Sequence, residues 1–161
     1  MVQTEHAGDE RFFDYVVYGR PVSAQPESRG SRQRVKKSGK LPQWRNIIST
    51  AIDESWDTYS KDFFIDFLRL DLLWVYDAKL PNDPDLDNII KPFIDRLEGR
   101  LYQGDEGFRE MHSYKFAVGE PWSMGALVEK LQTALGSQRE FVYVRVSPLR
   151  PDTIRSLDLV R

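Results

Sequence analysis

The sequence predicts an α/β sandwich of the α+β kind, in which helices pack on a small mixed, mostly antiparallel sheet of four strands. Four segments rich in aromatic and β-branched residues alternate along the chain with three amphipathic segments. The chain has 161 residues, of which 40% are apolar, and this suffices for a hydrophobic core without stabilising disulfides or metals. We therefore expect a single domain over residues 1–161, with mobile tails at 1–11 and 149–161.

The first three elements follow from composition and periodicity. Phe12–Tyr18 is aromatic and β-branched, which predicts a strand that ends at Gly19 and Pro21. Residues 22–41 are rich in Ser, Gly, Pro, Arg and Lys and show no periodicity, so we expect a long basic loop. A helix from Pro42 to about Tyr59 follows, because apolar residues recur at helical spacing. The residues of this predicted face are Trp44, Ile47, Ile48, Ala51, Ile52 and Ser55.

The middle of the chain predicts a buried strand and then a short helix. Phe63–Tyr76 reads as a strand, and its second half is apolar throughout, which is typical of a strand covered on both faces. Residues 77–84 form a turn-rich loop. Pro92 lacks an N–H and is best tolerated in a first turn, so the helix begins near Asp87 or Asn88.

The last elements are marked by a glycine and by alternation. Gly99 is a plausible end for the second helix, and a turn over 101–107 follows it. We expect a third strand over Glu110–Val118, a short amphipathic helix over Met124–Leu135 and a final strand over Phe141–Val146.

Composition excludes several classes of function. The chain has no cysteine, so disulfides, zinc–thiolate sites and cysteine nucleophiles are ruled out. The first ten residues are polar and lack the apolar stretch of a signal peptide, and no apolar run is long enough to span a membrane. The two histidines, His6 and His112, are weak catalytic candidates. A cytoplasmic protein without a membrane partner is the default expectation.

Charge is unevenly distributed, although the net charge is only -2. Residues 20–45 carry eight Arg or Lys against one Glu, and residues 77–106 carry eight Asp or Glu against four Arg or Lys. A basic arm that holds phosphates and an acidic pocket that holds a metal can serve one polyanion. A pair of solvated loops is the alternative interpretation. The arm residues with this expected DNA-binding role are Arg29, Arg32, Arg34, Lys36, Lys37 and Lys40.

The acidic stretch contains a pattern that suggests metal chemistry. Asp85 and Asp87 are two apart, Lys91 follows four later, and Asp105 lies beyond Gly104. Clustered carboxylates repel one another, and Mg²⁺ relieves that repulsion because it prefers oxygen ligands. A lysine in such a cluster could neutralise charge, hold a phosphate or steer a water. Since all four flank the predicted helix, we expect them to converge at one end of it, with the paired aspartates at its anion-favouring N-terminus.

Each of these residues also has a structural interpretation. Asp85 could be a turn residue and Asp87 an N-cap. Lys91 could pair with Asp87 in an ion pair worth only about 0.3–0.5 kcal/mol. Asp105 could serve an acidic loop. Asp95, two turns into the helix, either supports the metal ligands or is solvated.

The motif resembles the signature of RusA-type Holliday junction resolvases. The resemblance lies in Asp85-Leu-Asp-Asn-Ile-Ile-Lys-Pro-Phe-Ile-Asp-Arg-Leu97, in Tyr102-Gln-Gly-Asp105, and more weakly in the passage from Gly19 to Gln25. It implies that Asp85, Asp87 and Asp105 are catalytic metal ligands and that Lys91 is the catalytic lysine. It further implies a homodimeric endonuclease that cuts four-way DNA junctions by paired incisions during recombination and repair, with Mg²⁺ as cofactor and Mn²⁺ as a substitute.

The chain departs from the family pattern at two places. Gly104 stands where the pattern has the first aspartate of an Asp-Asp step, and Glu106-Gly107 replaces a small residue followed by glutamine. The helix near residues 123–136 and the C-terminal tail are additions to the pattern. These departures motivate a second hypothesis, namely a RusA-like protein that binds branched nucleic acid or a partner without cutting. A nuclease for flaps or other branched DNA is a third.

Overall fold

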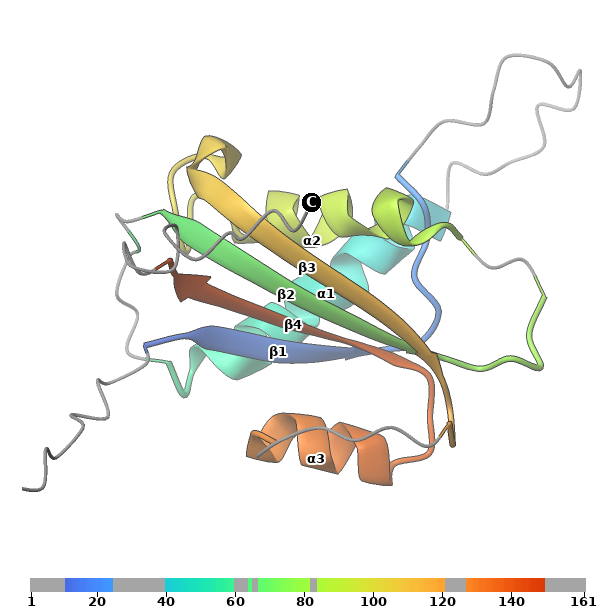
Figure 1. The fold of residues 1–161 in the computed structure, drawn as a ribbon. Helices are drawn as coiled ribbons and strands as arrows, with labels where there is room; N and C mark the ends of the chain where they lie inside the picture. The colour runs from blue at the N-terminus through green and yellow to red at the C-terminus, as the bar shows by residue number, and fades with distance from the viewer. Residues whose placement is uncertain are drawn as a thin grey trace, which may run out of the picture.

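A computed structural model of the chain describes residues 11–24, 40–59, 64, 67–81, 84–120 and 127–149. The element order matches the predicted alternation of strands and helices (Figure 1). In chain order the elements are β1 (Phe13–Tyr18), α1 (Lys40–Trp56), β2 (Leu68–Tyr76), the 3₁₀ turn η1 (Leu86–Ile89), α2 (Ile90–Leu97), the 3₁₀ turn η2 (Asp105–Gly107), β3 (Phe108–Ala117), α3 (Glu129–Gly136) and β4 (Phe141–Pro148).

The four strands form one mixed sheet in the order β1-β4-β2-β3. β4 runs antiparallel to both of its neighbours, whereas β2 and β3 are parallel. The predicted mixed, mostly antiparallel sheet is therefore confirmed. A parallel pair needs a crossover connection. Here that crossover contains η1 and α2, so the acidic stretch lies in the segment that returns the chain from the end of β2 to the start of β3.

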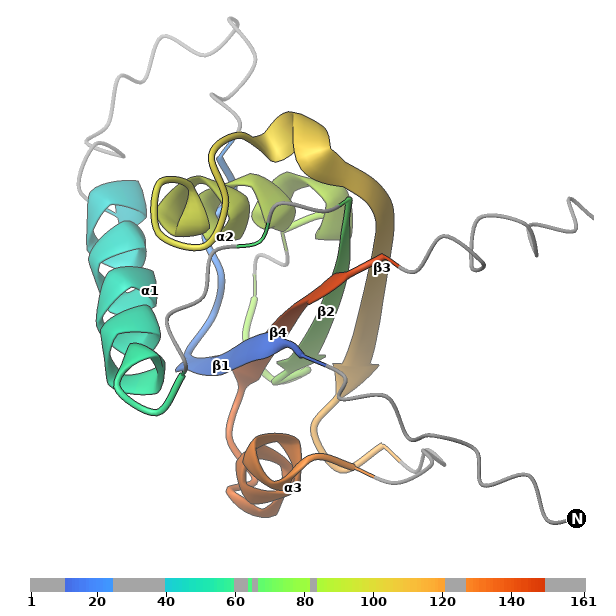
Figure 2. The same ribbon diagram turned by 90° about the vertical axis from the view of Figure 1, so that its left-hand side faces the viewer.

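Helices cover both faces of the sheet. Figure 2 shows α1 and α2 on one side and α3 on the other. Leu72 and Trp74 of β2 belong to the larger core under α1 and α2, whereas Leu73 and Val75 belong to the smaller core under α3. Since side chains alternate between the faces of a strand, an apolar run with no alternation must be covered twice. The prediction for this half of β2 is confirmed.

Several boundaries differ from those predicted. α1 begins at Lys40, so Pro42 does lie in its first turn, but Ile47 is 47% exposed and does not belong to the buried face. β2 begins at Leu68, five residues later than predicted. Phe64 is nevertheless buried, and its N–H donates to the Leu101 carbonyl at 2.8 Å. Its backbone N–H is therefore bonded to the turn after α2 and not to a neighbouring strand.

The second helical segment begins as a tight turn and then widens. η1 starts after Asp85, α2 starts at Ile90, and Pro92 occupies the first turn of α2. Gly99 follows the helix with φ 78°, a left-handed conformation that glycine adopts at little cost. The proline and the glycine therefore define the two ends of the helix as the sequence indicated.

The ends of the chain and the basic loop are described only in part. Of the predicted tails, Leu149 is buried and its N–H donates to the Phe67 carbonyl at 2.6 Å, so the ordered chain continues past β4. Arg11 lies over the Phe64 ring, 4.8 Å from its centroid. The rest of both tails, residues 25–39 of the basic loop and residues 121–126 before α3 lie outside the described residues. In the part of the chain that is described, no helix is long and apolar enough to cross a membrane.

Candidate functional site

The paired aspartates lie at the start of the η1–α2 segment. We call residues 85–88 the acidic turn. Asp85 precedes η1 in an extended conformation, and its side chain makes no capping hydrogen bond. Asp87 lies within η1 and is not the N-cap of either helical element. Both side chains are exposed. The N-cap interpretation of Asp87 is therefore wrong, and neither carboxylate is buried in the fold.

Lys91 lies one turn further along, but it points to a different partner from the one considered first. Its Nζ is 2.9 Å from Oδ1 of Asp95, four residues later. The two side chains are 66% and 31% exposed, and an exposed pair of this kind contributes only about 0.3–0.5 kcal/mol. Asp95 is thus paired with Lys91 on the helix surface. Because the pair is weak, Lys91 can exchange its partner for a phosphate at small cost.

Asp105 lies beyond the other end of α2. Its backbone begins η2, which leads directly into β3, and its side chain lies outside the described residues. Figure 1 shows η2 beside the C-terminal end of α2 and the acidic turn at the N-terminal end. Tyr102 holds the intervening turn on α2, because its buried hydroxyl donates to the Ile94 carbonyl at 2.6 Å. Asp85, Asp87 and Lys91 share the η1–α2 segment, whereas the backbone of Asp105 begins η2, beyond the turn that follows α2.

No three acidic or histidine side chains converge closely enough to hold a metal ion in the described part of the chain. The two paired aspartates could nevertheless supply part of a Mg²⁺ site. Asp85 and Asp87 supply exposed carboxylate oxygens, and Mg²⁺ is commonly bound by one or two carboxylates together with substrate phosphates. The three-carboxylate set, which includes Asp105, stays a prediction of the resemblance.

The segments on either side of the basic loop contact the η1–α2 segment. On the N-terminal side, the N–H of Ala24 donates to the Asn88 carbonyl at 3.1 Å. On the C-terminal side, the chain enters α1 at the exposed residue Lys40, and Trp44 packs edge-on against Phe93 of α2 with ring centroids 6.0 Å apart. The loop that carries most of the predicted DNA-binding cations, whose residues 25–39 are not described, therefore begins beside the acidic turn, and the helix that follows it packs on α2.

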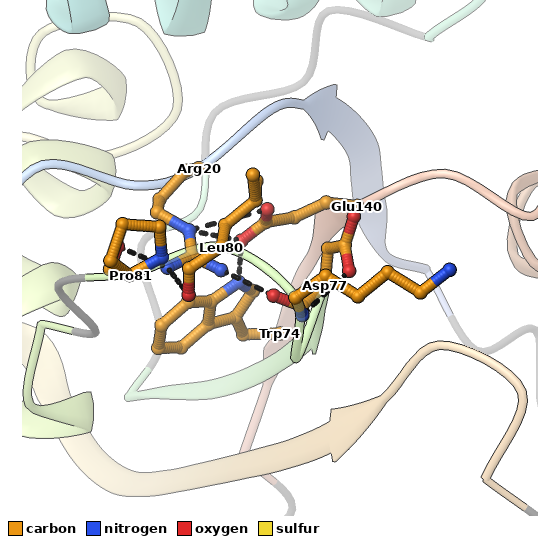
Figure 3. Close-up of polar contacts among 7 residues, drawn as sticks. Arg20, Trp74, Asp77, Leu80, Pro81 and Glu140 are labelled. Atoms are coloured by element: carbon orange, nitrogen blue, oxygen red, sulfur yellow. Dashed lines mark hydrogen bonds and ion pairs between the residues drawn. The ribbon is translucent and has the colours of Figure 1, made fainter.

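A largely buried ion pair, Arg20 with Glu140, holds the connection between β2 and the acidic turn (Figure 3). Arg20 contacts both carboxylate oxygens of Glu140, at 3.1 and 3.3 Å, and the indole N–H of Trp74 donates to the same carboxylate at 3.0 Å. The other guanidinium nitrogens donate to three backbone carbonyls between β2 and η1. Sequence reasoning missed this cluster and counted Arg20 among the cations of the basic arm. Arg20 and Glu140 are 120 residues apart, so no local pattern could reveal the pair.

The opposite face of the sheet carries a second polar cluster. Arg69 donates to Asp71 and, at 3.1 Å, to Nδ1 of His112, while His112 Nε2 is 2.8 Å from Glu110. Since a guanidinium only donates, Nδ1 accepts and Nε2 carries the proton. The hydrogen bond to the Asp71 carboxylate raises the pKa of Arg69. Both ring nitrogens are engaged, which agrees with a structural histidine.

A cavity of about 470 Å³ separates this cluster from α3. Apolar residues of α3 and of the sheet form one wall, and Arg69, Asp71 and Arg145 form the other. Tyr143 also lines it and donates its hydroxyl to the buried Asp14 at 3.0 Å. Burial, together with the Asp14 carboxylate, raises the pKa of Tyr143 well above its usual value. Lys130 of α3 also pairs with Asp14 at 3.0 Å, so this ion pair ties α3 to β1.

Comparison with known proteins assigns no family to the chain. No protein-family model matches the sequence, and no curated protein matches it. The likeness to RusA-type resolvases therefore rests on the motif residues alone.

Proposed function

We propose that the protein is a Mg²⁺-dependent, structure-specific endonuclease that resolves four-way DNA junctions by hydrolysing phosphodiester bonds. One observation carries the proposal: the chain entering the basic loop is hydrogen-bonded to the acidic turn through Ala24 and Asn88, and the helix that follows the loop packs on α2 through Trp44 and Phe93. A polyanion held by the loop would pass over Asp85 and Asp87. Neutralising several phosphates with the loop cations would also make binding steeply dependent on salt.

In this proposal Asp85 and Asp87 hold Mg²⁺ together with the phosphate to be cut. The bound ion would lower the pKa of a coordinated water and stabilise charge in the transition state. The chain's own residues do the rest. The two carboxylates would hold the ion against the phosphate, and Lys91 would leave its surface pair with Asp95 to contact that phosphate or the attacking water. Paired incisions and the RusA-like motif would place the protein in recombination and repair.

Asp105 and the proposed homodimer belong together in this account. The backbone of Asp105 follows the C-terminal end of α2, whereas the paired aspartates lie at its N-terminal end. A two-fold dimer that sets the α2 helices side by side in opposite directions would place Asp105 of one chain near Asp85 and Asp87 of its partner. We propose this shared arrangement for the three-carboxylate set.

Mixing two inactive variants tests the shared arrangement. A heterodimer of Asp87→Asn and Asp105→Asn subunits has one site with both substitutions and one intact site, if sites are shared. We expect the equimolar mixture, after unfolding and refolding, to recover nicking of a junction that neither variant nicks alone. No recovery, with heterodimers verified by differential tags, would show that each site is built within one chain.

The rival hypothesis is a binding protein that does not cut, and the departures from the family pattern motivate it. Gly104 stands where the pattern has an aspartate, and Glu106-Gly107 replaces a small residue followed by glutamine. A Cβ at position 104 would meet only the end of the exposed Glu106 side chain, which can move aside, so sterics alone do not exclude an aspartate there.

A panel of substrates separates the hypotheses. The protein is incubated with four-way, flap and linear duplex DNA, with and without Mg²⁺ and with Mn²⁺ in its place. Cleavage of the four-way junction alone supports the proposal, and cleavage of flaps with equal rate supports a broader branched-DNA nuclease. Tight binding of the junction without any cleavage would establish the binding protein.

A further inference from the structure

We infer that Arg20 is a positioning residue that fixes the acidic turn from two sides. Its effect on cleavage rests on the proposed function, whereas its effect on the order of the turn does not. Arg20 follows β1, and its guanidinium contacts Glu140 and the connection that leads to the acidic turn.

The guanidinium of Arg20 holds the connection that leads to the acidic turn. Nη1 donates to the carbonyls of Leu80 and Pro81 at 3.1 and 2.9 Å, and Nη2 donates to the carbonyl of Asp77 at 2.7 Å (Figure 3). Pro81 is only four residues before Asp85. Four residues reach about 14 Å at most, so a connection fixed at Pro81 restricts where Asp85 can lie.

The backbone of Arg20 leads to the same turn from the other side. Ala24, four residues after Arg20, donates its N–H to the Asn88 carbonyl. η1 itself is a single 3₁₀ turn of four residues without a side-chain cap, so it has little stability of its own. Arg20 thus anchors the connection before η1, and it also precedes residues 21–24, the segment that is hydrogen-bonded to η1 through Ala24.

A buried carboxylate keeps Arg20 in this position. The Arg20 and Glu140 side chains are 18% and 7% exposed, and Gly19 donates its N–H to the backbone carbonyl of Glu140 at 2.9 Å. Trp74 donates to the same carboxylate from the core of the sheet. The anchor is therefore tied to β4 and β2, the two central strands, and it transmits their rigidity to the turn.

Only an arginine can make these contacts at once. Nε is used on Glu140 while the two Nη groups reach three carbonyls in other directions, and the planar fork fixes those directions. A lysine keeps the charge beside Glu140 but has one ammonium group for all partners. Arg20→Lys therefore keeps the ion pair and releases the connection. Arg100→Lys is the matched control, because Arg100 pairs with Asp53 on the surface and lies away from the connection.

Hydrogen exchange measures the order of the turn directly. In Arg20→Lys we expect amides between residues 77 and 90 to exchange at least ten times faster than in the wild type, while those of β2 and β4 keep their rates. Arg100→Lys should match the wild type throughout. Unchanged exchange over 77–90 in Arg20→Lys would overturn the inference, whether or not the protein cuts DNA.

Cleavage kinetics then separate positioning from a purely structural role. At a temperature where the variant is fully folded, we expect its single-turnover rate on a four-way junction to fall at least tenfold. The Mg²⁺ concentration for half-maximal rate should rise, and the Kd for the junction should stay within twofold. A residue that only stabilised the fold would lower Tm and leave rate and metal dependence unchanged, which would refute the catalytic part. If the wild type cuts no DNA, the proposed function fails and the exchange experiment still decides the anchor.

Discussion

The Arg20–Glu140 pair allows a quantitative test of how the fold holds its buried charge. Glu140→Leu removes the carboxylate and leaves the buried indole N–H of Trp74 without its acceptor. An orphaned buried donor costs about 1–3 kcal/mol. Arg20 keeps its three carbonyl partners, so we expect a total loss of about 3–4 kcal/mol in the free energy of unfolding, at the lower end for a broken buried pair.

Substituting the other partner of the pair, Arg20, should cost at least as much. Arg20→Met leaves the Glu140 carboxylate buried with Trp74 as the remaining donor of the cluster, and removing one partner of a buried pair typically costs about 3–5 kcal/mol. The double variant contains no orphaned charge, and apolar replacement of a whole buried pair is often nearly neutral. We therefore expect the double variant to lose less free energy of unfolding than the sum of the two single losses, with a coupling energy of at least about 2 kcal/mol.

Urea unfolding of the four proteins, followed by tryptophan fluorescence, gives this coupling energy. Trp74 lies against the pair and is fully buried, so its emission reports the local environment as well. If the two single losses add to the double loss within about 0.5 kcal/mol, the residues act independently and the reasoning is refuted.

Three further predictions concern single positions. The folded protein keeps the Tyr143 hydroxyl protonated above pH 10, where the unfolded chain releases the proton, so the free energy of unfolding should fall as pH rises past 10. Tyr143→Phe should reduce this pH dependence by up to about 1.4 kcal/mol per pH unit, measured by urea unfolding between pH 9 and 11. Gly99→Ala should cost about 1–2 kcal/mol because φ is 78° there, whereas Gly136→Ala, at the end of α3 without positive φ, should stabilise by about 0.5 kcal/mol; equal effects on Tm would contradict this. Lys91→Ala should leave Tm within one degree because its pair with Asp95 is exposed, but should slow junction cleavage at least tenfold; a proportionate loss of both would mean that Lys91 is structural.

Local sequence patterns located the elements because their causes are local. Pro92 and Gly99 have backbone requirements that only certain positions of a helix meet, and the structure places them there. The unbroken apolar run in β2 required cover on both faces, and α3 supplies the second cover. The start of β2 was missed because Phe63–Phe67 has a strand-like composition, while the buried Phe64 contacts the turn at Leu101.

The candidate site was predictable only where its residues are close in sequence. Asp85, Asp87 and Lys91 share one helical segment, so their spacing fixes their proximity. Asp105 is separated from them in sequence by the whole of α2, so spacing alone does not encode whether its side chain joins them, and its convergence with them stays a prediction. The charge count likewise placed Arg20 in the basic arm, because its partner Glu140 lies 120 residues further along the chain, just before β4.

The central claim is that the acidic turn carries out Mg²⁺-dependent cleavage of branched DNA. The most direct test is the single-turnover rate on a four-way junction for the wild type, for Asp87→Asn, and for Asp57→Asn as a control with the same charge change on an exposed aspartate elsewhere. We expect Asp87→Asn to lose at least a thousandfold in rate while its junction affinity is retained, and Asp57→Asn to cut like the wild type. Full cleavage by Asp87→Asn would contradict the assignment of the site.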